Sequence, residues 1–334
     1  SRLMRHVFRR VGIYLLAIWA AVTVNFFLPR LAPGNPAEIV YNRLSQRGPV
    51  SPATLKALEI QFGVNTTDPL WVQYISYLNN LIHGNLGIST NYYPAPVTQI
   101  IAQDIPWTLT LLTVSVALSF ALGTLLGIFV AWKRNTAFDT ITSTIMTFFY
   151  SILYPWLALM AVFFIGYTLG WFPFSDGYDV SLTPGPNLDL LASAAYHAVL
   201  PALTLIVSTV AGWMLTMRNS MITTLSEDYV LMAQAKGLRQ RRVMFSYAAR
   251  NAILPSVTGF AIALGAVVGG ALLVEIVFSY PGIGYALFQA IQSQDYFLAD
   301  GILLLIIVAT VIMNLVVDLL YTALDPRVRQ ERSA

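Results

Sequence analysis

Long apolar stretches separated by short polar segments dominate the pattern of this chain. An apolar stretch of about 20 residues can cross a lipid bilayer as a helix, and six stretches of that order are present: Val11–Leu28, Ile105–Trp132, Phe138–Gly170, His197–Met217, Ala252–Phe278 and Phe297–Tyr321. The pattern therefore predicts an all-α integral membrane protein with six transmembrane helices.

Two of these stretches have unusual features. The third is long and contains Pro155, and because proline breaks the backbone hydrogen bonding of a helix, we expect a kink there. The first follows four arginines, as a signal peptide does, but its apolar run is longer than a signal core and no small-residue cleavage site follows. We expect it to remain as a membrane helix.

Composition supports a membrane protein. The 334 residues are 57% hydrophobic and only 10% charged, whereas soluble domains carry about 25% charged residues. The absence of cysteine excludes disulfides, thiol nucleophiles and thiolate metal sites.

The distribution of Lys and Arg predicts the orientation. Placing both termini and the 133–137 and 218–251 loops in the cytoplasm puts 15 of the 19 basic residues inside, and the other four lie in the long first outer loop. The positive-inside rule then predicts that the N-terminus and the C-terminus are both cytoplasmic.

The first outer loop is long enough to form a structured cap. Ser51-Pro52 and Asp68-Pro69 each have the pattern of a helix start, and Gly84 can end the second helix. Apolar residues from Leu70 to Ile82 form one stripe, which favours a helix resting on the membrane or on the spans. A docking surface for an extracytoplasmic partner is compatible with the same pattern.

The longest polar segment of the second half, Ser226–Pro255, carries five basic residues between two spans. Ser226 can cap a short helix whose first turn holds Glu227 and Asp228, and Gly237 suits a left-handed C-terminal cap. We expect a short helix over about 226–237 that is presented to another protein. We expect most of its arginines to be topology anchors that lie on anionic lipid.

The sequence contains none of the catalytic motifs that we considered. There is no phosphate-binding G-x-x-x-x-G-K-[ST] loop, and the histidines His6, His83 and His197 are scattered, which argues against a metal site. Two ionisable residues, Glu275 and Asp318, are predicted to lie inside spans, where an ionisable side chain is costly and suggests a function. We expect Glu275 to reach interfacial water or the backbone of the following turn, and Asp318 to pair with a basic residue or an indole.

At Ser226–Pro255 the sequence resembles the cytoplasmic loop of inner-membrane permease subunits of binding-protein-dependent ABC importers. The matching residues are Asp228-Tyr229, Ala233-x-Ala235-Lys236-Gly237-Leu238 and Arg250-Asn251-Ala252-Ile253-Leu254-Pro255. The general signature has Glu-Ala-Ala where this chain has Leu231-Met232-Ala233. This departure, with a longer gap from glycine to proline, resembles the dipeptide/oligopeptide/nickel branch rather than the sugar branch.

Further segments, in order along nearly the whole chain, are similar to the B-type subunits of that branch. They are Phe27–Pro36 (with Asn35 where aspartate is commoner), Phe62-Gly63, Pro69–Tyr74, Gly84–Gly87, Glu275–Phe278, Pro281-Gly282-x-Gly284 and Asp325-Pro326-Arg327-x-Arg329.

The resemblance implies a multi-pass subunit of a bacterial or archaeal cytoplasmic membrane. It would pair with a second, C-type permease, two ATP-binding subunits and an extracytoplasmic substrate-binding protein, with no nucleic-acid partner. This chain would hold no cofactor and perform no catalysis, because ATP and Mg belong to the partner ATPases. The implied division is 1–30 (basic segment and first span), 31–103 (outer cap) and 104–334 (permease core).

The resemblance also implies site residues. Contact with the ATPase falls to the coupling helix: Glu227, Asp228, Tyr229, Ala233, Ala235, Lys236, Gly237, Leu238 and Arg239. Candidates for the pore or its structure are Gly265, Gly269, Glu275, Pro281 and Gly282. The glycines of the fifth span, Gly265 and Gly269 among them, would let helices approach closely at the pore; lipid-facing small residues are the alternative.

The expected cargo is di- or oligopeptides, with nickel chelates or oligosaccharides as alternatives. A stand-alone secondary transporter or channel, and an anchoring subunit without transport, are the other classes that the residues leave open.

Overall fold

The computed structural model describes residues 2–31, 34–63, 68–182, 185, 187–267 and 272–324, and in this part the chain is helical. The one strand-like feature among these residues is a single antiparallel bridge between Ile88 and Pro96. The chain forms two compact units, Ser1–Trp107 with Pro281–Val316, and Thr108–Tyr280 with Val317–Ala334. The expected all-helical architecture is confirmed.

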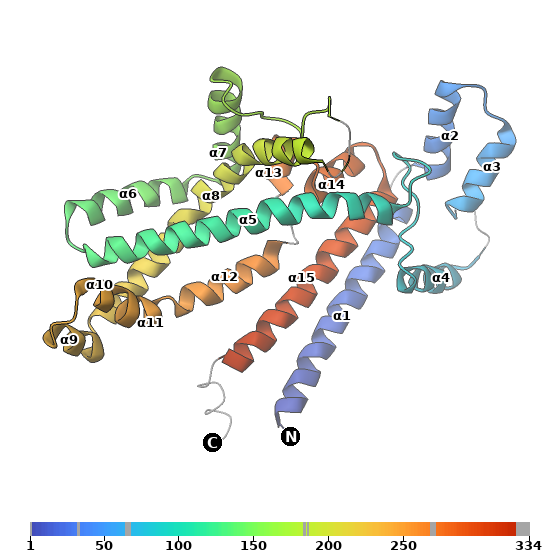
Figure 1. The fold of residues 1–334 in the computed structure, drawn as a ribbon. Helices are drawn as coiled ribbons and strands as arrows, with labels where there is room; N and C mark the ends of the chain where they lie inside the picture. Colours follow the sequence, from blue (N-terminus) through green and yellow to red (C-terminus); the bar gives the residue numbers. More distant parts are fainter. Residues whose placement is uncertain are drawn as a thin grey trace. The chain divides into compact units, whose positions relative to one another are not determined.

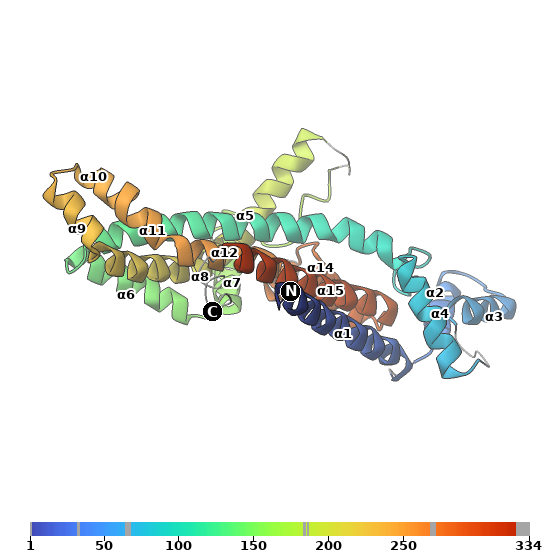
Figure 2. The ribbon, with the colours of Figure 1, turned by 90° about the horizontal axis from the view of Figure 1, so that it is seen from below.

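The first unit pairs the two ends of the chain. Figures 1 and 2 both show α1 beside α15, and the Asn25 side-chain amide of α1 donates a 2.9 Å hydrogen bond to the Asp300 carbonyl of α15. The helices of this unit are α1 (Arg2–Leu31), α2 (Pro36–Arg47), α3 (Pro52–Gln61), α4 (Leu70–Ile82), the first turns of α5 (Val97–Trp132), α14 (Ile283–Gln292) and α15 (Tyr296–Leu324) as far as Val316.

Some of the helix caps predicted for this unit are present in the structure, and one is not. The Ser51 hydroxyl accepts from the Ala53 amide at the start of α3, as expected, and Gly84 has a φ of +71° just after α4 ends. The prediction that Asp68 caps α4 was wrong, because Pro69 is the residue before the helix and no side chain caps it.

Asp295, which the sequence analysis did not single out, joins the loop before α5 to α15. Its fully buried carboxylate accepts from the Leu298 amide at 3.2 Å, the Asn91 amide at 3.0 Å and the Ser89 hydroxyl. One side chain therefore caps α15 and holds the loop in place.

The second unit contains the rest of α5 and the helices that follow it in the chain. These are α6 (Ala137–Ser151), α7 (Tyr154–Ala161), the π-helical η1 (Val162–Thr168), α8 (Leu188–Leu225), α9 (Asp228–Ala235), α10 (Gln240–Arg242), the π-helical η2 (Val243–Ala249), α11 (Arg250–Ala252), α12 (Leu254–Ala266) and α13 (Leu272–Val277).

Four helices of the described part are long and apolar enough to cross a membrane: Val11–Leu31, Val97–Trp132, Leu188–Leu225 and Tyr296–Val316. A fifth candidate is the pair Ala137–Ser151 and Tyr154–Thr168, bent by 93°. The predicted kink at Pro155 is a full break just before this residue, because a continuing helix would set the proline ring against the carbonyl of Ser151. The stretch Ala252–Phe278 is divided between α12 and α13, and residues 268–271 lie outside the described part. The count of six spans stays a prediction.

The contact between α5 and α8 is close enough to require glycine. An added Cβ at Gly123 would lie 2.6 Å from the Val210 carbonyl, and one at Gly127 would lie 2.6 Å from the Met214 carbonyl. Between these helices the hydroxyls of Ser119 and Thr209 share a 2.7 Å hydrogen bond. Small residues and interhelical hydrogen bonds are the usual means of association for helices in lipid.

We expect Gly127→Ala to destabilise the second unit, because its methyl group would overlap the backbone of α8. Overpacking of this kind costs about 1–3 kcal/mol, which should lower the midpoint of thermal unfolding of the detergent-purified protein. Gly12→Ala is the matched control, since a Cβ at Gly12 in α1 meets nothing within 4 Å. Equal midpoints for the two variants would contradict the close contact.

Candidate functional site: the helix α9 and the cluster beneath it

Helix α9 is short and sharply ended. The Leu238 amide donates to the Ala233 carbonyl at 3.4 Å and the Gly237 amide donates to the Gln234 carbonyl at 2.9 Å. This is the Schellman pattern, which needs a left-handed residue after the helix, and Gly237 supplies it with a φ of +72°. The C-terminal cap predicted at Gly237 is confirmed.

The start of α9 differs from the prediction. Glu227, not Ser226, precedes the first helical residue, and no side chain caps it. The Ser226 hydroxyl instead donates to the Thr223 carbonyl at 2.7 Å and closes the end of α8. Only about two residues separate the helices, so Ser226 is used by the preceding helix.

One face of α9 packs on an apolar cluster, the α9 platform. Val230 and Ala233 are buried, and Leu238 packs against them from beyond the helix. Since residues three apart share a face of a helix, one side of α9 is attached to the rest of the unit. The remaining buried members are Ile128 and Ala131 of α5, Met217, Met221 and Leu225 of α8, and Val243, Met244, Ala248, Ala249 and Ala252 after α9.

The opposite face of α9 is exposed and partly apolar. Tyr229, Leu231 and Met232 are 39%, 49% and 59% exposed. The Tyr229 hydroxyl also accepts a 2.8 Å hydrogen bond from the Asn251 side-chain amide. The short helix therefore presents an apolar surface of fixed orientation.

The structure brings one set of the predicted site residues together on and after α9. Glu227, Asp228, Ala235, Lys236 and Arg239 are exposed beside Tyr229, while Ala233 faces the platform.

The second set does not gather around α9. Gly265 lies in α12 and Gly269 lies outside the described residues. Pro281 and Gly282 precede α14 in the first unit, where Gly282 is the residue before the helix. The role of this second set in a pore stays a prediction.

Glu275 is completely buried and accepts a 2.8 Å hydrogen bond from the Thr108 hydroxyl of α5. The sequence predicts interfacial water or the following turn as the partner of Glu275 and gives no indication of Thr108. A threonine inside an apolar helix gives no signal of its partner until the helices are packed. The side chain of Asp318 lies outside the described residues.

A second buried charge, missed by the sequence analysis, lies in the same unit as α9. Asp139, at the start of α6, accepts from Arg218 of α8 at 2.7 Å and 2.9 Å, and also from the Asn135 amide and the Ser143 hydroxyl. Two parallel bonds between guanidinium and carboxylate are a strong, directional pairing. Arg218, counted above among the cytoplasmic basic residues, thus links the α5–α6 turn to α8.

Comparison with known proteins identifies the family. Residues 123–330, which include α9 and its platform, match the family described as the binding-protein-dependent transport system inner membrane component. The chain belongs to this family.

Named members of this inner membrane component family match almost end to end. The di/tripeptide transport system permease protein DppB of Pseudomonas aeruginosa is 32% identical over 99% of this chain and 100% of its own length. The dipeptide transport system permease protein DppB of Alkalihalophilus pseudofirmus is 32% identical over 98% and 100%. The oligopeptide transport system permease protein AppB of Bacillus subtilis is 29% identical over 97% and 98%. The resemblance noted in the sequence is confirmed.

We expect Arg218→Ala to destabilise this family member, because it leaves the Asp139 carboxylate buried without its cation. Hydrogen bonds to charged groups contribute about 1.5–3 kcal/mol, so the unfolding midpoint should fall clearly. Arg239→Ala, at an exposed arginine of the same unit, is the control and should leave the midpoint unchanged. An unaffected Arg218→Ala protein would show that the pair contributes nothing to stability.

Proposed function

We propose that this chain is the B-type permease subunit of an ATP-driven importer of di- or oligopeptides. The cargo is supported by the names of three full-length relatives, which are di/tripeptide, dipeptide and oligopeptide permease proteins. In this proposal the chain forms the translocation pathway with a C-type permease. It crosses the membrane six times with both termini in the cytoplasm.

The observation that carries the energetic part of the proposal is the exposed apolar face of α9. A helix of eight residues is marginal on its own in water. Here it is stabilised by the two backbone hydrogen bonds of its C-terminal cap and by packing on the α9 platform. Large apolar side chains exposed on a rigid helix are typical of a surface that another protein covers. We assign that surface to an ATP-binding subunit.

The platform offers a route for movement of the ATPase to reach the spans. Val230 and Ala233 contact a cluster formed by the ends of α5 and α8 and by the segment that leads into α12. Because packed interiors are dense and transmit displacement, a push on α9 would move these three helices together. Closing of two ATPases would thereby switch the pathway between its inward-open and outward-open states.

The segment 31–103 is proposed as the outer cap that receives the substrate-binding protein. Its helix α4 has no buried residue, and Leu70, Trp71, Ile75 and Ile82 are each more than half exposed. On its other side Tyr74 packs edge-on against Phe26 of α1, with ring centroids 5.1 Å apart. The helix thus rests on α1, one of the two placements expected, and keeps an apolar surface free for a partner.

Binding of the ATPase should depend on the exposed face of α9. We expect Met232→Glu, which places a charge on that face, to reduce the amount of ATP-binding subunit that copurifies with the tagged chain by tenfold or more. Gln234→Glu adds the same charge at an exposed polar position and is the control. Normal recovery of the ATPase with Met232→Glu would exclude this face as its contact.

Coupling should also depend on the backbone at Gly237. A Cβ there meets nothing within 4 Å, so only the φ of +72° restricts the residue. A β-branched residue resists this conformation by about 1–2 kcal/mol, whereas asparagine tolerates it. In proteoliposomes of the complete importer, Gly237→Val should lower peptide uptake relative to ATP hydrolysis by about tenfold, and Gly237→Asn should keep it.

Equal ratios of uptake to hydrolysis in the two Gly237 variants would contradict a coupling role for α9. Peptide uptake by this chain alone in liposomes would contradict the importer itself, and would favour a stand-alone carrier. Both assays need membrane insertion of the variants to be checked first.

A further inference from the structure

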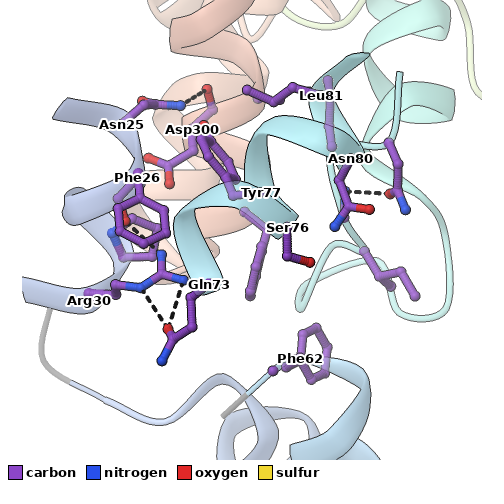
Figure 3. A pocket seen from close by; sticks show the side chains of 18 of the residues that line it. Asn25, Phe26, Arg30, Phe62, Gln73, Ser76, Tyr77, Asn80, Leu81 and Asp300 are labelled. Carbon is purple, nitrogen blue, oxygen red and sulfur yellow. Dashed lines mark hydrogen bonds between the residues drawn. The ribbon is translucent and has the colours of Figure 1, made fainter. Parts of the chain in front are cut away.

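A cavity of about 500 Å³ lies within the first unit, between α1, α4, α15 and the loop after α4. This volume lies in the range of small-molecule sites, about 300–1,000 Å³. Figure 3 shows that Asp300 and Arg30 both face this cavity, together with the side chains of Phe26, Tyr77 and Asn80. Two acids, Asp300 and Asp68, and one base, Arg30, thus line one small space.

The carboxylate of Asp300 has no hydrogen bond and no ion pair among the described residues; the bond recorded for this residue uses its backbone carbonyl. Asp300 lies one turn inside α15, within the apolar span Tyr296–Val316, and was not singled out in the sequence. A half-buried carboxylate without a partner is costly, and within a membrane span it defaults to a functional role.

The Arg30 side chain is held in place, but not all of its hydrogen-bond donors have a partner among the described residues. Its guanidinium lies 3.6 Å from the centre of the Phe26 ring and donates to the Phe26 carbonyl at 2.7 Å. Two further bonds go to the Gln73 side-chain oxygen, at 3.3 Å and 3.2 Å. Since a guanidinium has five N–H donors, two remain for a ligand.

Neutral polar groups complete the cavity. The Asn25 side chain is buried and donates to the Asp300 carbonyl, and the Tyr77 hydroxyl belongs to the same lining. Burial raises the pKa of the Tyr77 hydroxyl, so at neutral pH this group stays protonated and can donate. Aromatic and aliphatic side chains, among them Phe62, Leu81 and Phe297, line the cavity together with further polar groups, namely Gln61, Asp68, Gln73, Ser76, Asn80 and Asn85.

These charges do not favour a metal ion or a simple anion. Within the described residues no group of three or more His, Asp or Glu is placed to hold a metal, and a lone anion near Arg30 would leave Asp300 unpaired. A ligand that carries a primary ammonium and an anionic group satisfies both. An ammonium has three donors for a carboxylate, and an anionic oxygen accepts from the free guanidinium N–H groups.

We propose that this cavity binds a zwitterion, with its primary ammonium on Asp300 and its anionic group on Arg30. A free peptide and an ethanolamine phospholipid headgroup share this chemistry. The peptide source rests on the proposed function, and the phospholipid source does not.

The test uses the purified full-length chain in detergent, and leucyl-leucine and phosphatidylethanolamine as probes. Each probe has a partner that lacks the ammonium N–H donors, namely N-acetyl-leucyl-leucine and phosphatidylcholine. We expect calorimetry or native mass spectrometry to show at least tenfold tighter binding of one primary-ammonium probe than of its partner. The probe that shows this preference identifies the source.

Asp300→Asn should abolish the preference for the primary-ammonium probe over its partner. Arg30→Gln should weaken binding of the preferred probe by tenfold or more. Glu38→Gln, an exposed acid of the same unit that lies outside the cavity, should keep wild-type binding. If Asp300→Asn does not fold, the comparison of each probe with its partner on the wild-type chain still decides the question.

Absence of binding by both probes, equal binding of each probe and its partner, or an unchanged preference in Asp300→Asn would overturn the site. Peptide uptake by the complete importer is measured in parallel. Uptake without binding at this cavity would refute the site alone, and binding without uptake would refute the proposed function alone.

Discussion

The close contact between α5 and α8 is the interaction on which the second unit depends. In lipid there is no hydrophobic driving force between apolar helices, so association needs tight packing and hydrogen bonds. Gly123 and Gly127 allow the packing, and the Ser119–Thr209 bond adds a polar tie. The same pair of helices continues into Ile128, Met217 and Met221, which form part of the α9 platform. The surface proposed for the ATPase therefore rests on the contact between two spans.

Buried polar groups define the other fixed points of the molecule. Asp139 and Arg218 neutralise each other between α6 and α8, Glu275 is held by Thr108, and Asp295 caps α15 while it binds a loop. Each has a partner because an unsatisfied polar group in an apolar interior costs free energy. The half-buried Asp300 carboxylate has no such hydrogen bond among the described residues and faces a cavity with room for a ligand, which motivates the zwitterion site.

Patterns that depend only on neighbouring residues in the sequence were sufficient to predict many features of this fold. Hydrophobic runs predicted the helical membrane fold, Pro155 predicted the break between α6 and α7, and Ser51 and Gly237 predicted caps that the structure confirms. The family followed from short motifs spread along the chain. These features are local, because hydropathy, proline geometry and left-handed glycine act within a few residues. The prediction that Ser226 caps α9 was wrong, because this residue lies between two helices and its hydroxyl bonds to the end of α8 instead.

Only the tertiary structure decided which distant residues meet. Nothing near Thr108 indicates Glu275, 167 residues later, and Arg218 resembled a topology anchor until Asp139 was found beside it. The cavity of Arg30 and Asp300 likewise joins residues from opposite ends of the chain. Such pairings depend on how helices pack, which follows from shape and from the need to satisfy buried charge. The sequence alone determined that the chain is a helical membrane protein of this family; packing decided where its charges are paired and where one carboxylate is left for a ligand.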